Sequence, residues 1–273
     1  MSEVKAGDHQ EIILKAKNGM FVLILNILLM LAALAGMIFG ITQSTEAVNV
    51  TPWVILSVVS GLYFSLVGPI LFAGLKVLKP NEALVLTLFG RYYGTLKLPG
   101  FYFVNPFAIA FNPSTRNTSS GKLVNELTAV KALPQGTAVP FVSKKISLKA
   151  MTLNNDKQKI NDQLGNPIII GIVVIWRVVN TAKAVFNVDN FTEFLSIQTD
   201  AALRNIVSLY PYDASDSMDN EKSLRGSSRE IAERLKDEIQ AKAEMAGLEV
   251  MEARITHLSY APEIAAAMLQ RQQ

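Results

Sequence analysis

Residues 166–180 read NPIIIGIVVIWRVVN and form the most apolar stretch in the second half of the chain. Two interpretations compete: a membrane-spanning helix, or a buried strand of a soluble domain. The uninterrupted apolar run covers only nine residues before Arg177, whereas a spanning helix needs about 20. Nine of the twelve residues from Ile168 to Val179 are Ile or Val, whose branched side chains favour a strand. The stretch is therefore predicted to be a central strand, antiparallel to another at 144–155.

One region near the N-terminus carries almost no charge. Between Lys17 and Lys76 the only charged residue is Glu46. Two apolar segments in this region are each longer than the roughly 20 residues that a helix needs to cross a bilayer. We therefore predict membrane-spanning helices at 20–41 and 52–78, joined by a short external loop at 42–51.

Lysines at both borders of this helical hairpin predict its orientation. Lys15 and Lys17 precede the first apolar segment (20–41), Lys76 and Lys79 follow the second (53–75), and the loop between the spans has neither Lys nor Arg. Positively charged flanks stay in the cytoplasm. Residues 1–19 are therefore predicted to be a cytosolic tail, and the protein is expected in the cell membrane with both chain ends in the cytoplasm.

Small residues recur within both predicted spans. Gly36 and Gly40 form a GxxxG pair, and Ser57, Gly61 and Ser65 follow one another at every fourth position. Such rows let two helices approach closely, either within this hairpin or between neighbouring copies. The apolar segments 20–41 and 53–75 within these spans contain no acidic or basic residue, which argues against an ion or proton path.

After the second span, residues 79–261 are predicted to form one α+β domain. Alternating apolar residues at 81–90 and the aromatic stretch 101–107 indicate a β-hairpin close to the membrane surface. Residues 112–140 are rich in Pro, Gly and small polar residues, which predicts short strands with long connections. Beyond the central strand, helical spacing predicts a helix that is capped by Asp189 or Asn190 and ends at Pro211.

A second helix, a strand and a third helix follow. Ser227 and Glu230 have the spacing of a capping box at the start of the second helix, and Gly247 is placed where that helix ends. Residues 248–260 predict a strand, and residues 262–273 predict the start of a C-terminal helix. The sequence stops inside that helix without a stop signal, so we expect it to be a shortened form of a longer chain.

The residue types needed for catalysis or metal binding are scarce. The chain has no cysteine and only two histidines, His9 and His257, which excludes thiolate chemistry and argues against a zinc site. SSGKL at 119–123 lacks the first glycine and the Ser or Thr of a phosphate loop. Ser143–Lys144 and Ser147–Lys149 are better explained as the alternation of a half-exposed strand. We expect no catalytic residues, no cofactor and no metal, and the net charge of +3 indicates no nucleic-acid partner.

Four segments in a fixed order identify a family resemblance. They are PNEALVLTLFGRYYGTLKLPGFYFVNPF (80–107), NDQLGNPI (161–168) with the following IGIVVIWRV, VDNFTEFLSIQTDAALRNIVSLYPYD (188–213), and GLEVMEARITHLSYAPEIAAAMLQRQQ (247–273). Together they cover most of the chain after Pro80, and in this order the chain resembles the stomatin–prohibitin–flotillin (SPFH, band 7) superfamily.

The resemblance implies a curved antiparallel sheet with packed helices, followed by a long coiled-coil helix. It also implies that the domain lies against the membrane and that many copies assemble side by side. Family members are thought to organise membrane microdomains and to regulate neighbouring proteins, membrane-anchored proteases among them. No catalytic residues are known for this fold. The chain departs from the family pattern in having two full spans and a long polar segment at 112–140.

Three aromatic residues close to the second span suit the membrane surface. Phe101, Tyr102 and Phe103 follow the predicted span closely, and aromatic side chains are frequent at membrane–water interfaces. One interpretation is shallow docking on lipid. The other is that these rings form the core of the first hairpin.

Three functions are therefore compared. The first is a non-enzymatic membrane scaffold that forms a homo-oligomer of many copies, contacts membrane lipids and organises microdomains or corrals a partner protein. The second is a regulatory adaptor of one membrane-anchored protease in a small hetero-complex. The third, an integral membrane enzyme, is disfavoured because the sequence lacks a catalytic constellation. The first is the prediction.

Overall fold

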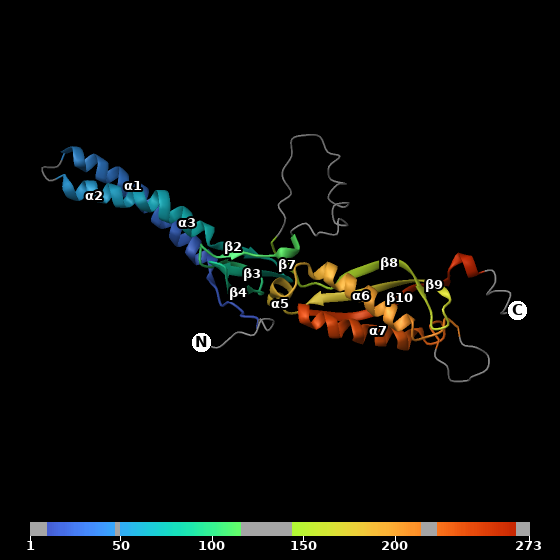
Figure 1. Cartoon of the computed structure of the whole chain (residues 1–273). Helices are drawn as coiled ribbons and strands as arrows, with labels where there is room; N and C mark the ends of the chain where they lie inside the picture. The colour runs from blue at the N-terminus through green and yellow to red at the C-terminus, as the bar shows by residue number, and fades with distance from the viewer. Residues whose placement is uncertain (1–9, 47–49, 116–143, 214–222, 266–273) are drawn as a thin grey trace, which may run out of the picture. The chain divides into compact units, whose positions relative to one another are not determined.

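The computed structural model describes residues 10–46, 50–115, 144–213 and 223–265, and the chain divides into two compact units (Figure 1). We call residues 12–111 with 144–146 the anchor unit. The described residues before 12, from 112 to 115 and from 147 onward form the sheet unit. The predicted single domain at 79–261 is thus divided, because its first strands pack with the apolar helices.

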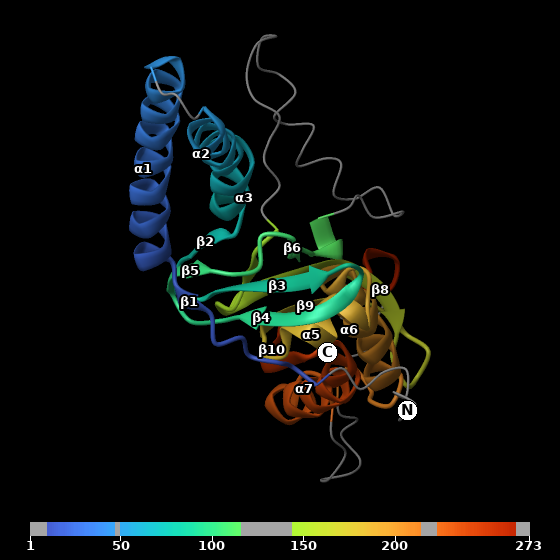
Figure 2. The same ribbon diagram turned by 90° about the vertical axis from the view of Figure 1, so that its left-hand side faces the viewer.

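Two long apolar helical segments begin the anchor unit. Helix α1 spans Gly19–Glu46, and the second segment consists of α2 (Thr51–Leu62), a π-helical turn (Tyr63–Val67) and α3 (Gly68–Ala73). The second segment lies along α1 (Figures 1 and 2). The predicted helix boundary at residue 78 is wrong. The helix ends at Ala73, and the backbone of β2 (Leu75–Leu78) pairs with another strand instead.

Two small sheets complete the anchor unit (Figure 2). In the first, β5 (Gly100–Phe103) lies between β1 (Lys17–Asn18) and β2. In the second, β3 (Glu82–Leu88) lies between β4 (Arg91–Leu96) and β6 (Ile109–Ala110) and also pairs with β7 (Ile146–Ser147).

The predicted hairpin of 81–90 with 101–107 is wrong, because β3 pairs with β4. Phe89 and Gly90 form the two-residue turn between these strands, both with positive φ (48° and 82°). Such a left-handed pair matches the twist of a hairpin. The aromatic stretch turns away to pair with β1 and β2.

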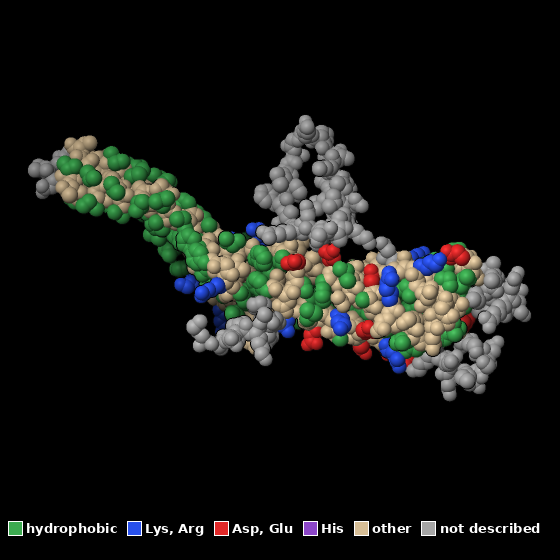
Figure 3. Space-filling view, in the orientation of Figure 1, with side chains coloured by type: hydrophobic (Ala, Val, Ile, Leu, Met, Phe, Trp, Pro, Cys, Tyr) green, Lys and Arg blue, Asp and Glu red, His purple; other side chains and the backbone are tan. Residues whose placement is uncertain are grey.

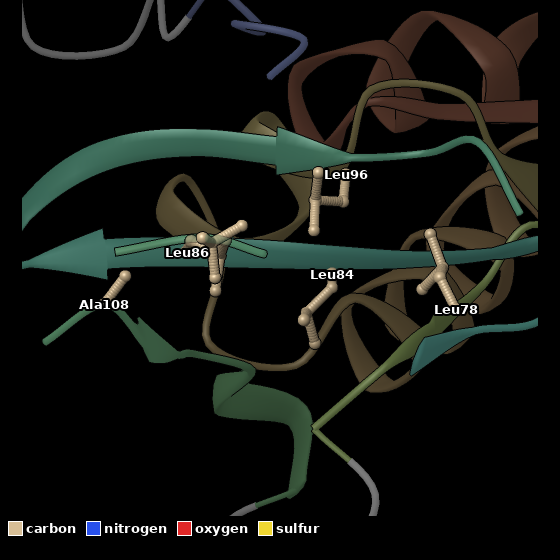
Figure 4. Packing of buried hydrophobic residues seen from close by; sticks show 6 residues of the cluster. Leu78, Leu84, Leu86, Leu96 and Ala108 are labelled. Atoms are coloured by element: carbon tan, nitrogen blue, oxygen red, sulfur yellow. The ribbon is translucent and has the colours of Figure 1, made fainter. Parts of the chain in front are cut away.

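A leucine-rich core holds the second sheet together (Figure 4). Its buried members come from β2, β3, β4 and the segment after β5: Leu78, Leu84, Leu86, Leu96, Val104 and Ala108. Leu14 and Ala16, from the chain just before α1, pack against the same cluster. The residues that precede the first helix are therefore part of the folded unit.

An ion pair joins the start of β3 to the segment before β7. The Lys145 ammonium donates to the Glu82 carboxylate at 3.0 Å, and this bond lowers the pKa of Glu82 below its ordinary value of 4.5. A depressed carboxylate pKa stabilises the folded state above the unfolded-state pKa, and this contribution is lost as pH falls through the folded-state pKa. Lys145→Gln should therefore lower the melting temperature at pH 7, with the difference from wild type shrinking below pH 4.5. A difference that does not change with pH in thermal melts would contradict this.

The sheet unit contains a three-stranded antiparallel sheet in the order β10-β9-β8. Its strands are β8 (Met151–Asn161), β9 (Pro167–Val178) and β10 (Leu248–Tyr260). The predictions that 168–179 is a central strand and that 248–260 is a strand are confirmed. The predicted partner strand at 144–155 is confirmed only from residue 151, because residues 146–147 form β7, which pairs with β3. One face of β9 is fully buried, from Ile168 through Trp176 to Val178. Arg177 is exposed and pairs with Glu249 at 2.6 Å.

Strand β8 continues to Asn161, six residues beyond the end of the strand predicted at 144–155. The turn that follows is closed by Asp162, a buried residue whose carboxylate accepts from the Leu164 and Asn166 backbone N–H groups at 3.0 and 2.7 Å. Asp162 also accepts from the Tyr212 backbone N–H at 3.1 Å. This bond joins the turn to the chain that follows helix α6 (Phe191–Val207). Residues 156–161 were not predicted as part of the strand because they are mostly polar, as residues of an edge strand can be.

Among its described residues the sheet unit contains the helices α5 (Thr181–Phe186), α6 (Phe191–Val207) and α7 (Ser228–Ala243), the last followed by a 3₁₀ turn (Glu244–Ala246), and a further helix begins at residue 262. Helix α6 packs on β8 and α7, and α7 packs on β10. Helix α5 was not predicted. Asn190 caps α6 as predicted, because its side-chain oxygen accepts from the Thr192 and Glu193 N–H groups.

Two predicted helix signals had different outcomes. Gly247 ends the α7 segment in the left-handed conformation (φ 66°), as predicted. Ser227 precedes α7, but its side chain makes no capping hydrogen bond, so the capping box is wrong. The chain before α7 already turns, with the Ser227 N–H donating to the Ser223 carbonyl at 2.9 Å.

Some predictions fall partly or wholly outside the described residues. Residues 262–265 are helical, as predicted for the start of the last helix. Residues 266–273, most of the 112–140 segment, the 119–123 motif, Ser143 and His9 lie outside the described ranges.

Candidate membrane interface

The surface of the paired helices is apolar (Figure 3). Segments Gly19–Thr45 and Thr51–Ala73, of 27 and 23 residues, are long and apolar enough to cross a membrane. Large apolar side chains such as Phe21, Leu28 and Val58 are more than half exposed. Soluble proteins rarely expose a continuous apolar surface of this extent. The arrangement suits a lipid environment.

The predicted GxxxG pair faces the second helix. A Cβ atom at Gly36 would lie 3.0 Å from the Ser60 hydroxyl. A Cβ atom at Gly40 would touch the Ser57 hydroxyl and lie 2.8 Å from the Trp53 carbonyl oxygen. The Trp53 ring also meets Phe39 edge to face, with ring centroids 5.6 Å apart. These contacts need glycine where the helices are closest.

The predicted row of Ser57, Gly61 and Ser65 does not stay on one face of the second helical segment. Gly61 faces α1, since its Cβ would lie 3.6 Å from the Met37 sulfur, whereas Ser65 is exposed and donates to the Gly61 carbonyl of its own helix. The π-helical turn at 63–67 adds a residue to this turn and rotates the following ones. Gly68 is buried in consequence, and its Cβ would lie 2.8 Å from the Met30 sulfur.

A polar bridge joins the two helices inside the apolar surface. Asn26 is only 3% exposed; its Nδ2 donates to the Gly68 carbonyl at 3.1 Å, and its Oδ1 accepts from the Tyr63 hydroxyl at 3.0 Å. In lipid, where water cannot replace them, such bonds specify which helix faces pair. The sequence showed a polar Asn26 but not its two partners.

Asn26→Leu should weaken the pairing of the helices by about 0.6–1.7 kcal/mol, the range measured for hydrogen bonds between membrane helices. The measurement is tryptophan fluorescence during titration of the purified protein with SDS, in a Trp176→Phe background so that the signal comes from Trp53 alone. Tyr63→Phe removes one of the two bonds, so the double variant should cost less than the sum of the single changes. Additive effects would show that the bridge does not act as a unit.

Strand β5 fixes the sheet-side ends of both helical segments. Its two neighbours are β1, which leads directly into α1, and β2, which follows α3. A Cβ at Gly19 would lie 2.9 Å from the Tyr102 carbonyl carbon, and one at Gly74 would lie 2.7 Å from the Phe103 ring. The helices are thus held by backbone pairing as well as by their own contact.

The three predicted surface aromatics all lie on β5, and each is half-buried. Tyr102 packs against the leucine-rich core and donates its hydroxyl hydrogen bond to the Pro99 carbonyl at 3.2 Å. Phe103 packs on Gly74 at the end of α3. Tyr102 therefore contributes to the core, whereas Phe101 and Phe103 alternate with it and point to the other face of the strand.

The described part of the chain contains no cluster of three or more acidic or histidine side chains able to hold a metal. His257 makes a 3.1 Å hydrogen bond with the Ser259 hydroxyl. The Ser147 hydroxyl accepts from the Lys149 backbone N–H at 3.3 Å rather than facing the ammonium.

The fold and this interface define a class of protein: a membrane-associated α+β protein with two apolar helices before its strands. Residues 76–273 match the model of the SPFH domain / Band 7 family, and the chain belongs to that family. The resemblance drawn from four sequence segments is therefore confirmed. A search of curated proteins gave no match.

Proposed function

We propose that this protein is a non-enzymatic integral membrane scaffold. Its two helical segments cross the membrane as a hairpin, with both chain ends in the cytoplasm. Many copies assemble side by side and organise lipids, or corral a partner membrane protein such as a protease. Membership of the SPFH / Band 7 family is consistent with a scaffold.

The strongest support comes from strand β5, which binds the base of both helical segments at once. A flexible tether would let the domain move freely beneath the membrane. Here the strands continue from the helices without a linker, because β1 ends at Asn18 and α1 begins at Gly19. Strands of the anchor unit that are held in a fixed orientation to the bilayer can present the same surface to each neighbouring copy.

Unpaired strand edges support assembly. In the sheet unit the outer strands β8 and β10, of 11 and 13 residues, each pair on one side only among the described residues. Free edges can accept a strand or segment from another chain. The helix that starts at residue 262 is a second element for association, in the proposed coiled coil.

Particle size in mild detergent tests the scaffold. A homogeneous assembly of many copies is the expected result, measured by light scattering or negative-stain microscopy. A small defined complex with one protease would favour the adaptor function instead. A monomer or dimer without partners would contradict both.

Cysteine labelling tests the topology, because the chain has no native cysteine. Ser44→Cys, near the end of α1, should react with an impermeant maleimide added outside intact cells. Ser119→Cys should react only after the membrane is opened. The reverse pattern would place the sheets on the outer side.

We further propose that Phe101 and Phe103 dock shallowly on lipid. A polarity-sensitive fluorophore at Phe101→Cys should shift to the blue in nanodiscs and be quenched by brominated lipids. The matched control is Leu164→Cys, an exposed turn residue of the sheet unit, which should show neither effect. Equal signals at both positions would contradict docking. The full chain is required, because β1 and β2 pair with the strand that carries these residues.

A further inference from the structure

A small pocket in the anchor unit lies beside the start of α1. Its volume is about 230 Å³, and the side chains that line it include Lys15, Lys17, Tyr93, Phe103 and Asn105. We call it the basal pocket. Binding sites for drug-sized molecules measure about 300–1,000 Å³, so this pocket suits a smaller group.

Backbone bonds hold the two lysines in place. The Leu14 N–H donates to the Thr95 carbonyl at 3.0 Å, and the Thr95 N–H donates to the Ile12 carbonyl at 2.8 Å. Further along, Lys17 pairs with Phe103 of β5. A Cβ at Gly94 would lie 2.5 Å from the Leu14 side chain, so glycine makes room for this segment. The chain before α1 is therefore held at two points, by the bridge between Ile13 and Thr95 and by β1 at Lys17–Asn18.

Alternation along this segment places both lysines on one face. Leu14 and Ala16 pack against the leucine-rich core. Residues two apart in an extended chain point the same way. Lys15 and Lys17 therefore share the opposite face, where both are exposed.

Their charge is not neutralised within the described residues, where none of the salt bridges includes Lys15 or Lys17. Helix α1 starts two residues after Lys17 and has no acidic residue in its first turn, so the positive end of its dipole adds to the field. Lys and Arg side chains gather where the apolar helices meet the strands (Figure 3). The basal pocket therefore favours an anion.

An amide and two aromatic residues complete the lining of the pocket. Asn105 uses its Oδ1 to accept from the Phe107 N–H at 3.0 Å, which leaves its NH₂ group as a donor. Tyr93 and Phe103 line the same pocket, together with the apolar residues Leu14, Ala16 and Val104. Two lysines, an amide donor and apolar neighbours suit a phosphate that is attached to an apolar body.

We propose that the basal pocket binds the phosphate of an anionic phospholipid in the leaflet next to the sheets. The inference rests on the proposed membrane-spanning function, because it needs α1 in the bilayer. Since α1 becomes apolar at Met20, a headgroup in the pocket can leave its acyl chains alongside the helix. Basic pockets at the cytoplasmic ends of membrane helices bind lipid headgroups in this way.

Native mass spectrometry of the full-length protein, with phosphatidylglycerol or phosphatidylcholine added at equal concentrations, tests the proposal. Wild type should retain phosphatidylglycerol preferentially. The double variant Lys15→Gln/Lys17→Gln should bind it about 25-fold more weakly, at roughly 1 kcal/mol for each lysine near a membrane surface. The matched control, Lys149→Gln/Lys236→Gln, makes the same change of charge in the sheet unit and should retain wild-type binding.

Three results would overturn the proposal. They are equal retention of the two lipids by wild type, an equal loss in the control variant, and displacement of phosphatidylglycerol by millimolar inorganic phosphate, which would indicate a site for free anions. Resistance to alkaline extraction from membranes is measured in parallel for every variant. Extraction of wild type would contradict the membrane-spanning function itself, whereas equal retention of the two lipids by fully integrated wild type would contradict the headgroup site alone.

Discussion

Gly247→Ala is expected to destabilise the sheet unit by about 2–5 kcal/mol. Gly247 has φ 66°, a left-handed conformation that costs any other residue about 1–2 kcal/mol. A Cβ there would also collide with the Asn180 carbonyl and lie 2.9 Å from the Lys183 side chain. Overpacking of this kind costs about 1–3 kcal/mol. Chemical denaturation of the detergent-solubilised protein measures the loss.

The collision matters because Gly247 joins the start of β10 to the end of β9. Its carbonyl accepts from the Val179 and Asn180 N–H groups, both at 3.0 Å. Asn180 in turn caps α5 by accepting from the Lys183 N–H. A shift of the backbone at Gly247 therefore disturbs two strands and one helix.

Gly165→Ala is the matched control. Gly165 also has a positive φ (80°), but a Cβ there would meet nothing within 4 Å. Only the conformational cost of about 1–2 kcal/mol is expected. Equal losses at the two glycines would show that the contacts around Gly247 contribute nothing beyond its backbone angle.

The elements that the sequence predicted best are those whose own residues decide them. Strand β9 was predictable because its branched apolar residues favour a strand and Arg177 makes the run too short to span a membrane. Helix α6 was predictable from Asn190 and a clear apolar stripe. In each case local preference and tertiary packing favour the same structure.

Strand partners were much harder to predict, because pairing is decided by distant parts of the chain. Residues 75–78 continue a helical pattern, yet their backbone pairs with β5. The polar residues of β8 gave no alternation to detect, although they belong to the same sheet as β9. The sequence contained one usable signal that was missed: Phe89–Gly90 separates two strand-like runs by two residues, the spacing of a tight hairpin.

The candidate membrane interface was predicted in outline but not in detail. The two apolar segments and Gly36 with Gly40 follow from composition and spacing. The exposed position of Ser65 could not be predicted from a regular helix, since a π-helical turn intervenes. Pro69 was the available signal, because proline lacks the N–H that would bond to the Ser65 carbonyl in an α-helix. The lysines of the basal pocket were noted only as charges, although the order Leu14, Lys15, Ala16, Lys17 already alternates.

Gly40→Ala should push the two apolar helices apart. The new Cβ would touch the Ser57 hydroxyl and lie 2.8 Å from the Trp53 carbonyl oxygen and 3.2 Å from the Ser57 backbone nitrogen. Two of these neighbours are backbone atoms of α2, so rotation of a side chain cannot relieve the contact. The helix itself must move, at an expected cost of about 1–3 kcal/mol.

Gly61→Ala provides the matched comparison on the other helix of the pair. Its Cβ would lie 3.6 Å from the sulfur of Met37, an ordinary contact with the flexible end of a side chain. SDS titration followed by Trp53 fluorescence, in the same Trp176→Phe background, should therefore shift to lower SDS for Gly40→Ala and stay near wild type for Gly61→Ala. Both substitutions replace glycine by the better helix former, so helix propensity cannot explain a difference between them. A shift of equal size in the two variants would mean that the helices do not meet at Gly40, and close packing of this hairpin would have to be abandoned in favour of contacts between neighbouring copies.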